Sequence, residues 1–96
     1  MFIVSLTYIR PPEDVEKNLK AHRDFLKIQY EKGNFITSGR KVPVTGGIIL
    51  ASVKSKTDLE EILIQDPFHK EYIASYEVTE FTPTMTGAEF ENLIGK

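Results

Sequence analysis

The chain has 96 residues, the length of one domain, and 41% of them are apolar, which is ordinary for a globular protein. Its 12 basic and 14 acidic residues give a formal charge of -2, so there is no positive surplus for binding nucleic acid or an anionic membrane. The absence of cysteine excludes disulfides, thiolate metal sites and a cysteine nucleophile. The apolar N-terminal stretch is too short for a signal-peptide core or a membrane span, so a cytoplasmic location is the default expectation.

The N-terminal half of the chain predicts a strand, a long helix and a second strand. Residues 2–9 alternate as a strand does, and their fully apolar face consists of Phe2, Val4, Leu6 and Tyr8. Pro12, followed by two acidic residues, predicts the start of a helix that ends near Gly33. The inward stripe of this helix has spacings of three and four residues: Val15, Leu19, His22, Leu26 and Gln29. A short strand over residues 34–38 and a loop over residues 40–47 follow.

The C-terminal half predicts a strand, a second helix and a last strand. Residues 48–53 are apolar on both faces, which is typical of a central strand. Ser55 begins a pattern that resembles a capping box, so it predicts the start of the second helix. Pro67 is expected to stop that helix, because the residue before a proline is pushed out of the α region. The last strand is expected over residues 72–81.

A tail follows this last strand. Thr86 and Glu89 form a capping box in front of apolar residues, so we expect residues 86–96 to form a short helix. This helix should pack through Phe90, Leu93 and Ile94. The whole chain is then a single domain, residues 1–96, with a core over residues 1–83 and a tail over residues 84–96.

The predicted order is β-α-β-β-α-β followed by the tail helix. This order is the ferredoxin-like arrangement of the α+β class, with a four-stranded antiparallel sheet. Both helices cover one face of such a sheet, and nothing in the chain is left to cover all of the other. We therefore expect a homodimer in which a second sheet supplies the cover, as in a dimeric α/β barrel.

Two residues are candidates for proton transfer. His22 lies on the inward stripe of the long helix, so it is either a core histidine satisfied by a backbone carbonyl or a proton carrier facing a pocket. Asp66 lies at the end of the second helix, so it is either a turn residue or a carboxylate that orients His22 and stabilises its imidazolium form. The topology puts both helices on one sheet face, which is compatible with a contact between the two side chains, and the residues alone leave that contact open.

The other polar candidates have ordinary alternatives. Ser38 is a nucleophile only with a base beside it, and otherwise a hydroxyl at a strand end. Arg10 and Arg40 either bind an anionic ligand group or are simply solvated. His69 falls in a segment expected to be exposed, and two histidines without metal-type spacing argue against a metal site. We expect Ser38, Arg40 and Phe68 to contact a small-molecule ligand, without a metal or another cofactor.

Four segments carry a resemblance to a known family. In chain order they read AHRDFL (residues 21–26), GNFITSG (33–39), GGIILA (46–51) and DPF (66–68). Over residues 2–83 the chain resembles the YciI-like family of small dimeric α/β-barrel proteins. The resemblance implies a ferredoxin-like fold, two subunits packed sheet to sheet, and an active-site pair that falls on His22 and Asp66. The family includes a dehydrochlorinase that acts on a chlorinated hydroxyquinol, and its architecture is similar to that of the muconolactone isomerases.

Two functions of different class follow from these observations. The first is a cofactor-independent lyase or isomerase in which His22 moves a proton on a small cyclic, phenolic or lactone-like substrate, with Asp66 fixing its tautomer. The second is a non-enzymatic module in which the same pocket binds a metabolite, or in which the dimer serves as an accessory partner. A strongly shifted His22 pKa in a concave site favours the first, and a His22 sealed in the core without a cavity favours the second, or no ligand at all.

Overall fold

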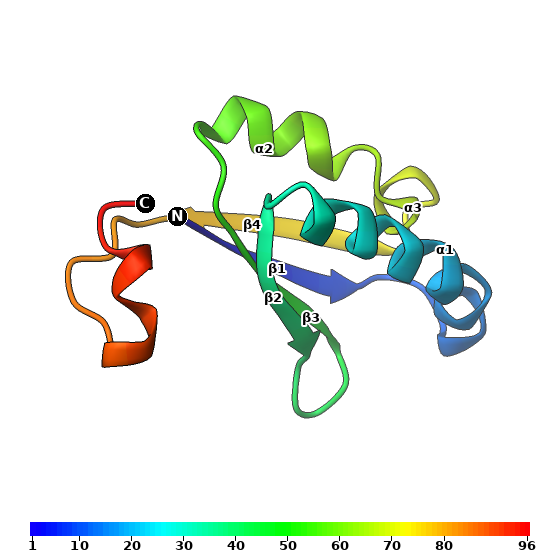
Figure 1. Ribbon diagram of the computed structural model, residues 1–96. Helices are drawn as coiled ribbons and strands as arrows, with labels where there is room; N and C mark the ends of the chain where they lie inside the picture. The colour runs from blue at the N-terminus through cyan, green and yellow to red at the C-terminus, as the bar shows by residue number, and fades with distance from the viewer.

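Four strands form one antiparallel sheet, in the order β2-β3-β1-β4, and the main helices lie against one of its faces (Figure 1). The computed structural model describes residues 1–96. The strands are β1 (Phe2–Tyr8), β2 (Phe35–Arg40), β3 (Gly46–Ala51) and β4 (Ala74–Glu80). The helices are α1 (Pro12–Glu31), α2 (Lys56–Leu63) and the short α3 (Pro67–Lys70), followed by a 3-10 segment, η1 (Ala88–Leu93). This is the ferredoxin-like α+β fold that the sequence predicts.

The core lies between the sheet and the helices, because the alternation of β1 puts its apolar residues on that side. Three residues of β1 are at most 2% exposed: Phe2, Val4 and Leu6. They pack with apolar residues of the other elements: Phe25, Phe35, Ile49, Ala51, Leu59, Leu63, Phe68, Ile73 and Ala74. The stripe of α1 around Leu19 and Leu26 is only partly buried against this core, so space remains between α1 and the sheet. None of the helices is long and apolar enough to cross a membrane.

The loop between β2 and β3 is shorter than the sequence predicts. β2 continues to Arg40, and β3 begins at Gly46, two residues before the expected start. Gly46 pairs with Thr7 of β1, and a Cβ atom at Gly46 would overlap the backbone carbonyl of Leu6. Only glycine permits this close approach of two strands. The glycines therefore belong to the sheet, and the loop keeps only residues 41–45.

Asp66 does not end the second helix, contrary to the prediction. α2 ends at Leu63, and Asp66 is the N-cap of α3. The backbone of Asp66 is extended, with φ -67° and ψ 127°, and its side chain accepts a hydrogen bond from the Phe68 amide at 3.0 Å. Pro67 imposes the extended conformation on the residue before it and supplies a preset φ for the first helical position. The proline therefore starts a helix here, and this turn fixes the direction of the carboxylate.

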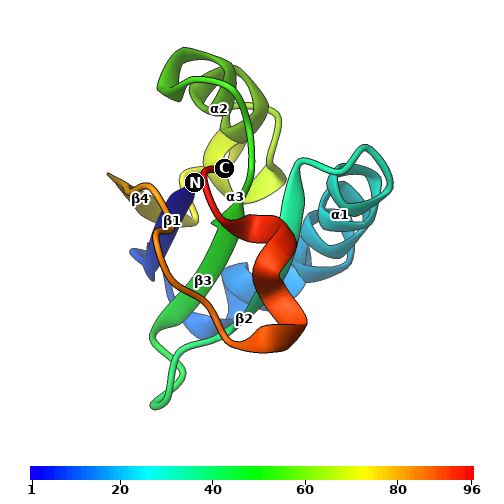
Figure 2. The same ribbon diagram turned by 60° about the vertical axis from the view of Figure 1, so that its left-hand side comes forward.

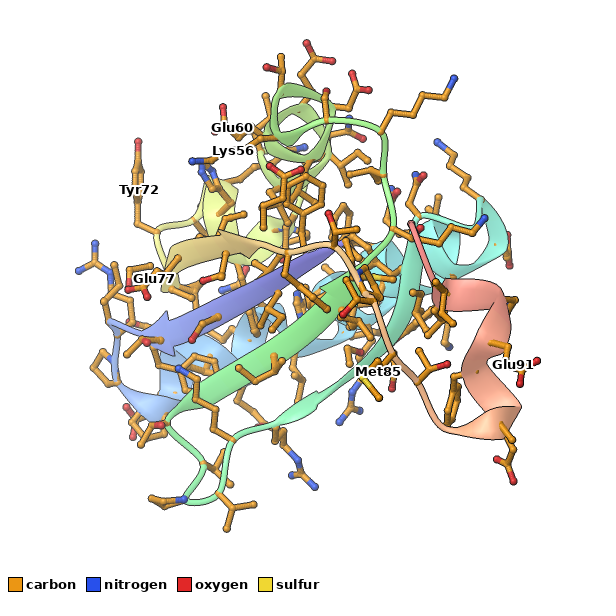
Figure 3. All side chains as sticks on the ribbon, turned by 90° about the vertical axis from the view of Figure 1, so that its left-hand side faces the viewer. Lys56, Glu60, Tyr72, Glu77, Met85 and Glu91 are labelled. Atoms are coloured by element: carbon orange, nitrogen blue, oxygen red, sulfur yellow. The ribbon has the colours of Figure 1, made fainter.

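The last strand also begins later than predicted, at Ala74. Tyr72 breaks the strand because its φ is 55°, in the left-handed region, and its side chain projects into solvent with 69% of its surface exposed (Figure 3). His69, expected in an exposed segment, is half-buried in α3, and its ring lies 5.3 Å from that of Tyr76. The short helix α3 thus brings the ring of His69 against the ring of Tyr76 in β4.

The tail forms a shorter and different helix from the predicted one. The segment η1 spans six residues of 3-10 helix, with Gly87 at its N-cap and no side-chain cap. The predicted capping box of Thr86 and Glu89 is therefore wrong. The Oγ1 atom of Thr86 is instead buried without a hydrogen-bond partner. Phe90 and Ile94 are 54% and 50% exposed, and Leu93 is half-buried. Eleven residues are marginal for an α-helix without strong tertiary contacts, which accounts for the difference.

The tail nevertheless brings the two chain ends together, as Figures 1 and 2 show. The amino group of Met1 donates to the carbonyl of Lys96 at 2.9 Å, and the Gly95 amide donates to the carbonyl of Pro83 at 2.9 Å. Glu91 points outward from this segment (Figure 3).

The second face of the sheet is largely uncovered. Ile3 and Ile48 belong to it and are 38% and 39% exposed. The tail reaches only one end of this face, where Leu50 and Leu93 line the same shallow hollow. An apolar sheet face normally packs against another layer, so this face is available for a further layer.

Candidate active site

The imidazole of His22 and the carboxylate of Asp66 meet between α1 and α3. The Nδ1 atom of His22 lies 2.8 Å from Oδ1 of Asp66, so the two side chains make the contact that the sequence leaves open. The His22 side chain is 12% exposed, whereas that of Asp66 is fully buried. A carboxylate is an acceptor only, so Nδ1 carries the proton and donates it to Asp66. The histidine therefore presents Nε2 as its free nitrogen.

Three donors surround the buried carboxylate of Asp66. Oδ1 accepts from Nδ1 of His22 and from the Phe68 amide at 3.0 Å. Oδ2 accepts from the hydroxyl of Tyr76 at 2.6 Å. A buried carboxylate is costly unless donors satisfy it, and hydrogen bonds to a charged acceptor are the strong ones. The three bonds hold this carboxylate in place and, through it, the ring of His22.

Tyr76 comes from β4, on the face of the sheet that the helices cover. It pairs with Leu6 across β1 and β4, and its ring is partly buried against the core. Burial raises the pKa of the Tyr76 phenol well above its usual range, and the negative charge of Asp66 and their hydrogen bond raise it further. Tyr76 therefore stays protonated and remains a donor to Asp66 at any physiological pH.

Phe68 packs against one face of the His22 imidazole. Its ring stacks on that of His22, with centroids 4.0 Å apart and planes within 4° of parallel. Tyr8 meets the same phenyl ring edge-on at 5.9 Å. Phe68 is 1% exposed, so the surface on which the imidazole rests is part of the core. The ring of His22 is thus fixed by a hydrogen bond at one edge and by a flat contact on one face.

A cavity of about 250 Å³ opens beside His22 between α1 and the sheet. Its apolar walls include Leu6, Leu26 and Ile49. Among the polar and aromatic residues at its edge are Tyr8, His22, Arg23, Ser38, Arg40 and Phe68. All five residues that the sequence proposes for the site are therefore close together, with Asp66 behind His22 and the other four on the cavity wall.

The other predicted candidates lie at or near this cavity, and they differ in the hydrogen bonds that their side chains make. The Ser38 hydroxyl pairs with the hydroxyl of Tyr30 from α1, and no histidine or carboxylate serves it as a base. Arg40 lies at the end of β2, and its side chain makes neither a hydrogen bond nor an ion pair. Arg10 is held away from the cavity, because its Nε donates to the carbonyl of Tyr72 at 3.2 Å. No three His, Asp or Glu side chains gather as a group able to hold a metal ion.

Comparisons with known proteins place this arrangement in a family. The model of the YCII-related domain matches residues 1–82. The chain belongs to the YCII-related domain family. A solved structure with the same fold is the 5-chloro-2-hydroxyhydroquinone dehydrochlorinase of Burkholderia phenoliruptrix, in complex with 2,5-dihydroxybenzoquinone. It is 18% identical, the alignment covers 85% of this chain and 94% of the dehydrochlorinase chain, and the TM-score is 0.70. No curated protein matches the sequence.

In this YCII-related domain the dyad has the geometry of a histidine base with an orienting carboxylate. Asp66 fixes the tautomer with hydrogen on Nδ1, and it would stabilise the positive charge if Nε2 took up a proton. The partly exposed His22 borders the cavity. The arrangement is therefore suited to moving one proton within a mostly apolar cavity.

Sequence reasoning missed three residues of the site: Tyr76, Arg23 and Tyr30. Tyr76 belongs to the predicted last strand, and strand alternation puts it on the same face as Ala74 and Val78, towards the helices. Arg23 directly follows His22 in the chain, so it lies outside the inward stripe of the long helix. The partnership of Tyr30 with Ser38 joins α1 to β2, and no spacing in the sequence signals it.

Proposed function

We propose that this YCII-related domain is a cofactor-independent lyase or isomerase that moves a proton on a small one-ring substrate. The phenolic, hydroxyquinone and lactone classes fit, because a phenolic O–H is acidic through delocalisation into the ring, and the O–H of a hydroxyquinone and the ring C–H of a lactone are acidic beside a carbonyl. The observation that carries the proposal is the bond of 2.8 Å between Nδ1 of His22 and the buried Asp66, which leaves Nε2 as the nitrogen available at the cavity. The dehydrochlorinase with this fold is named for an elimination on such a ring.

The proposed step begins with Nε2 of His22 as general base. Nε2 takes a proton from the ring, and the electron pair of the broken bond moves into the ring. In an elimination that pair forms a new double bond as the leaving group departs with its own pair; in an isomerisation the proton returns at another ring atom. The imidazolium formed at His22 is stabilised by Asp66, whose carboxylate is already satisfied by Tyr76 and Phe68. The positive charge that forms at His22 is therefore paired with the carboxylate of Asp66.

The test is turnover of a panel of chlorinated hydroxyquinols and unsaturated lactones by the wild-type chain and three variants. We expect His22→Ala and Asp66→Asn to lower turnover by about 10²–10⁴-fold while circular dichroism shows a folded protein. The matched control is His69→Ala, which removes the only other histidine and should keep turnover. Full turnover by His22→Ala would contradict the proposal. Binding of 2,5-dihydroxybenzoquinone by the wild type without turnover of any compound would favour the metabolite-binding module instead.

We also propose that the functional form is a homodimer that pairs through the uncovered sheet face. Ile3 and Ile48 lie on that face and are more than a third exposed, and the tail covers only the end beside Leu50. Pairing two such faces would bury the apolar residues of both sheets in one interface. Sedimentation at micromolar concentration should give twice the monomer mass, and a monomer mass at that concentration would contradict this part of the proposal.

A further inference from the structure

The charged groups at the cavity are all of one sign. Arg23 and Arg40 line it beside His22, and no Asp or Glu side chain does. The chain as a whole has the opposite balance, with 14 acidic residues against 12 basic ones. The one carboxylate close by, Asp66, is fully buried and bonded to His22. A ligand in this cavity therefore meets two guanidinium groups and no carboxylate on the cavity wall.

The two guanidinium groups are also free to bind. The only ion pairs of the structure join Lys20 to Asp24 and His22 to Asp66, so neither Arg23 nor Arg40 has a carboxylate partner. Neither guanidinium donates a hydrogen bond to the protein, whereas that of Arg10 donates to a backbone carbonyl. Arginine presents a planar fork of donors that matches the two oxygens of a planar oxyanion. Two guanidinium groups without a protein partner, beside an apolar cavity, are a suitable binding site for a planar oxyanion.

The positions of the two arginines put them on different walls. Arg23 comes from α1, next to His22 in the chain. Arg40 is the last residue of β2, where it pairs with Gly47, and it also borders a neighbouring hollow with Tyr8. The cavity of about 250 Å³ is at the small end for ligand sites, and a dry cavity of about 150 Å³ already holds benzene. The space is therefore suited to one substituted ring.

We propose that the ligand of this cavity is an organic anion: a single ring bearing a carboxylate or a deprotonated ring oxygen, bound by Arg23 and Arg40. The apolar walls and the flat His22–Phe68 stack accept the ring, and the arginines bind its oxyanion. This inference rests on the proposed function for the choice of site, and it adds the charge of the substrate. It also gives both arginines a role in binding, distinct from that of His22 in proton transfer.

The test compares two ligands of nearly equal size, one anionic and one with a neutral amide in place of the carboxylate: 2,5-dihydroxybenzoate and 2,5-dihydroxybenzamide. Calorimetric titration of the full chain should show that the carboxylate binds at least about tenfold more tightly than the amide. Arg23→Gln and Arg40→Gln should each weaken the carboxylate by about tenfold and leave the amide nearly unchanged. Arg10→Gln is the matched control and should change neither affinity. Repeating the titration with 2,5-dihydroxybenzoquinone, whose charge lies on ring oxygens, shows which oxyanion is preferred.

Equal affinities for the acid and the amide, no measurable binding of either anion, or unchanged binding in both arginine variants would overturn this inference. Its failure is distinguishable from failure of the proposed function. If the chain binds the anions through the arginines but turns over no substrate, this inference stands and the proposed enzymatic function is wrong. If turnover depends on His22 but is the same in both arginine variants, the proposed enzymatic function stands and this inference is wrong.

Discussion

Replacing Tyr76 by phenylalanine tests how the buried carboxylate is held. In the wild type the Tyr76 hydroxyl is the only donor to Oδ2 of Asp66, at 2.6 Å, whereas Oδ1 has two donors. Tyr76→Phe keeps the ring and leaves Oδ2 buried without a hydrogen bond. Because a lost bond to a buried charged group carries its desolvation penalty, the free energy of unfolding should fall by about 2–3 kcal/mol near neutral pH. Urea unfolding measures this difference.

The same variant gives a pH dependence with a defined sign. The pKa of the Tyr76 phenol is raised in the folded chain, so above pH of about 10 the unfolded chain loses this proton while the folded chain keeps it. Stability from this group is fully present below that pH and is lost as the pH rises further. Between pH 9 and pH 11 the wild type should lose about 1.4 kcal/mol through Tyr76, a loss that Tyr76→Phe cannot show. The difference in the free energy of unfolding between the wild type and Tyr76→Phe should therefore narrow by about 1.4 kcal/mol.

The matched control is Tyr72→Phe, which removes a hydroxyl that projects into solvent (Figure 3). It should change the free energy of unfolding by less than about 0.5 kcal/mol at every pH. If Tyr76→Phe costs no more than this control, or if its loss between pH 9 and pH 11 equals that of the wild type, the account of Asp66 and its donors is wrong.

Two further substitutions test the sheet. Gly46→Ala should cost at least about 3 kcal/mol or prevent folding, because its Cβ would overlap the backbone of Leu6, whereas Gly39→Ala meets open space and should be nearly neutral in urea unfolding. Ile48→Glu should convert the proposed homodimer to monomer in sedimentation, whereas Ile28→Glu, on an exposed position of α1, should leave the dimer intact. A stable Gly46→Ala, or a dimeric Ile48→Glu, would contradict the corresponding argument.

Much of the fold follows from local patterns in the sequence. The alternation from Phe2 to Tyr8 gave the buried face of β1, and the spacing from Val15 to Leu26 gave the inward stripe of α1. Both patterns are periodic over several residues, so they specify an element and its buried side. The element order then limits the sheet to few topologies, and the observed strand order is the ferredoxin-like one.

The remaining details depend on contacts between segments distant in the chain. Gly46 was expected in a loop because glycine is common in loops, and only its approach to Leu6 shows that it belongs to a strand. Asp66 was expected at the end of a helix because proline follows it, but the same proline starts α3 and turns the carboxylate towards His22. The donor from Tyr76 joins β4 to α3, and no spacing within one element indicates it.

The most direct test of the central claim is the tautomer of His22 in solution. Long-range ¹H–¹⁵N spectra at about pH 8.5 distinguish the two ring nitrogens of a neutral imidazole, and the chain has only two histidines, so His69→Gln assigns the signals. The account predicts a protonated Nδ1, bonded to Asp66, and a bare Nε2 that is free to accept a proton. It also predicts that Asp66→Asn weakens this preference. A His22 with its proton on Nε2 in the wild-type protein would contradict the assignment of Asp66 as the group that orients a histidine base.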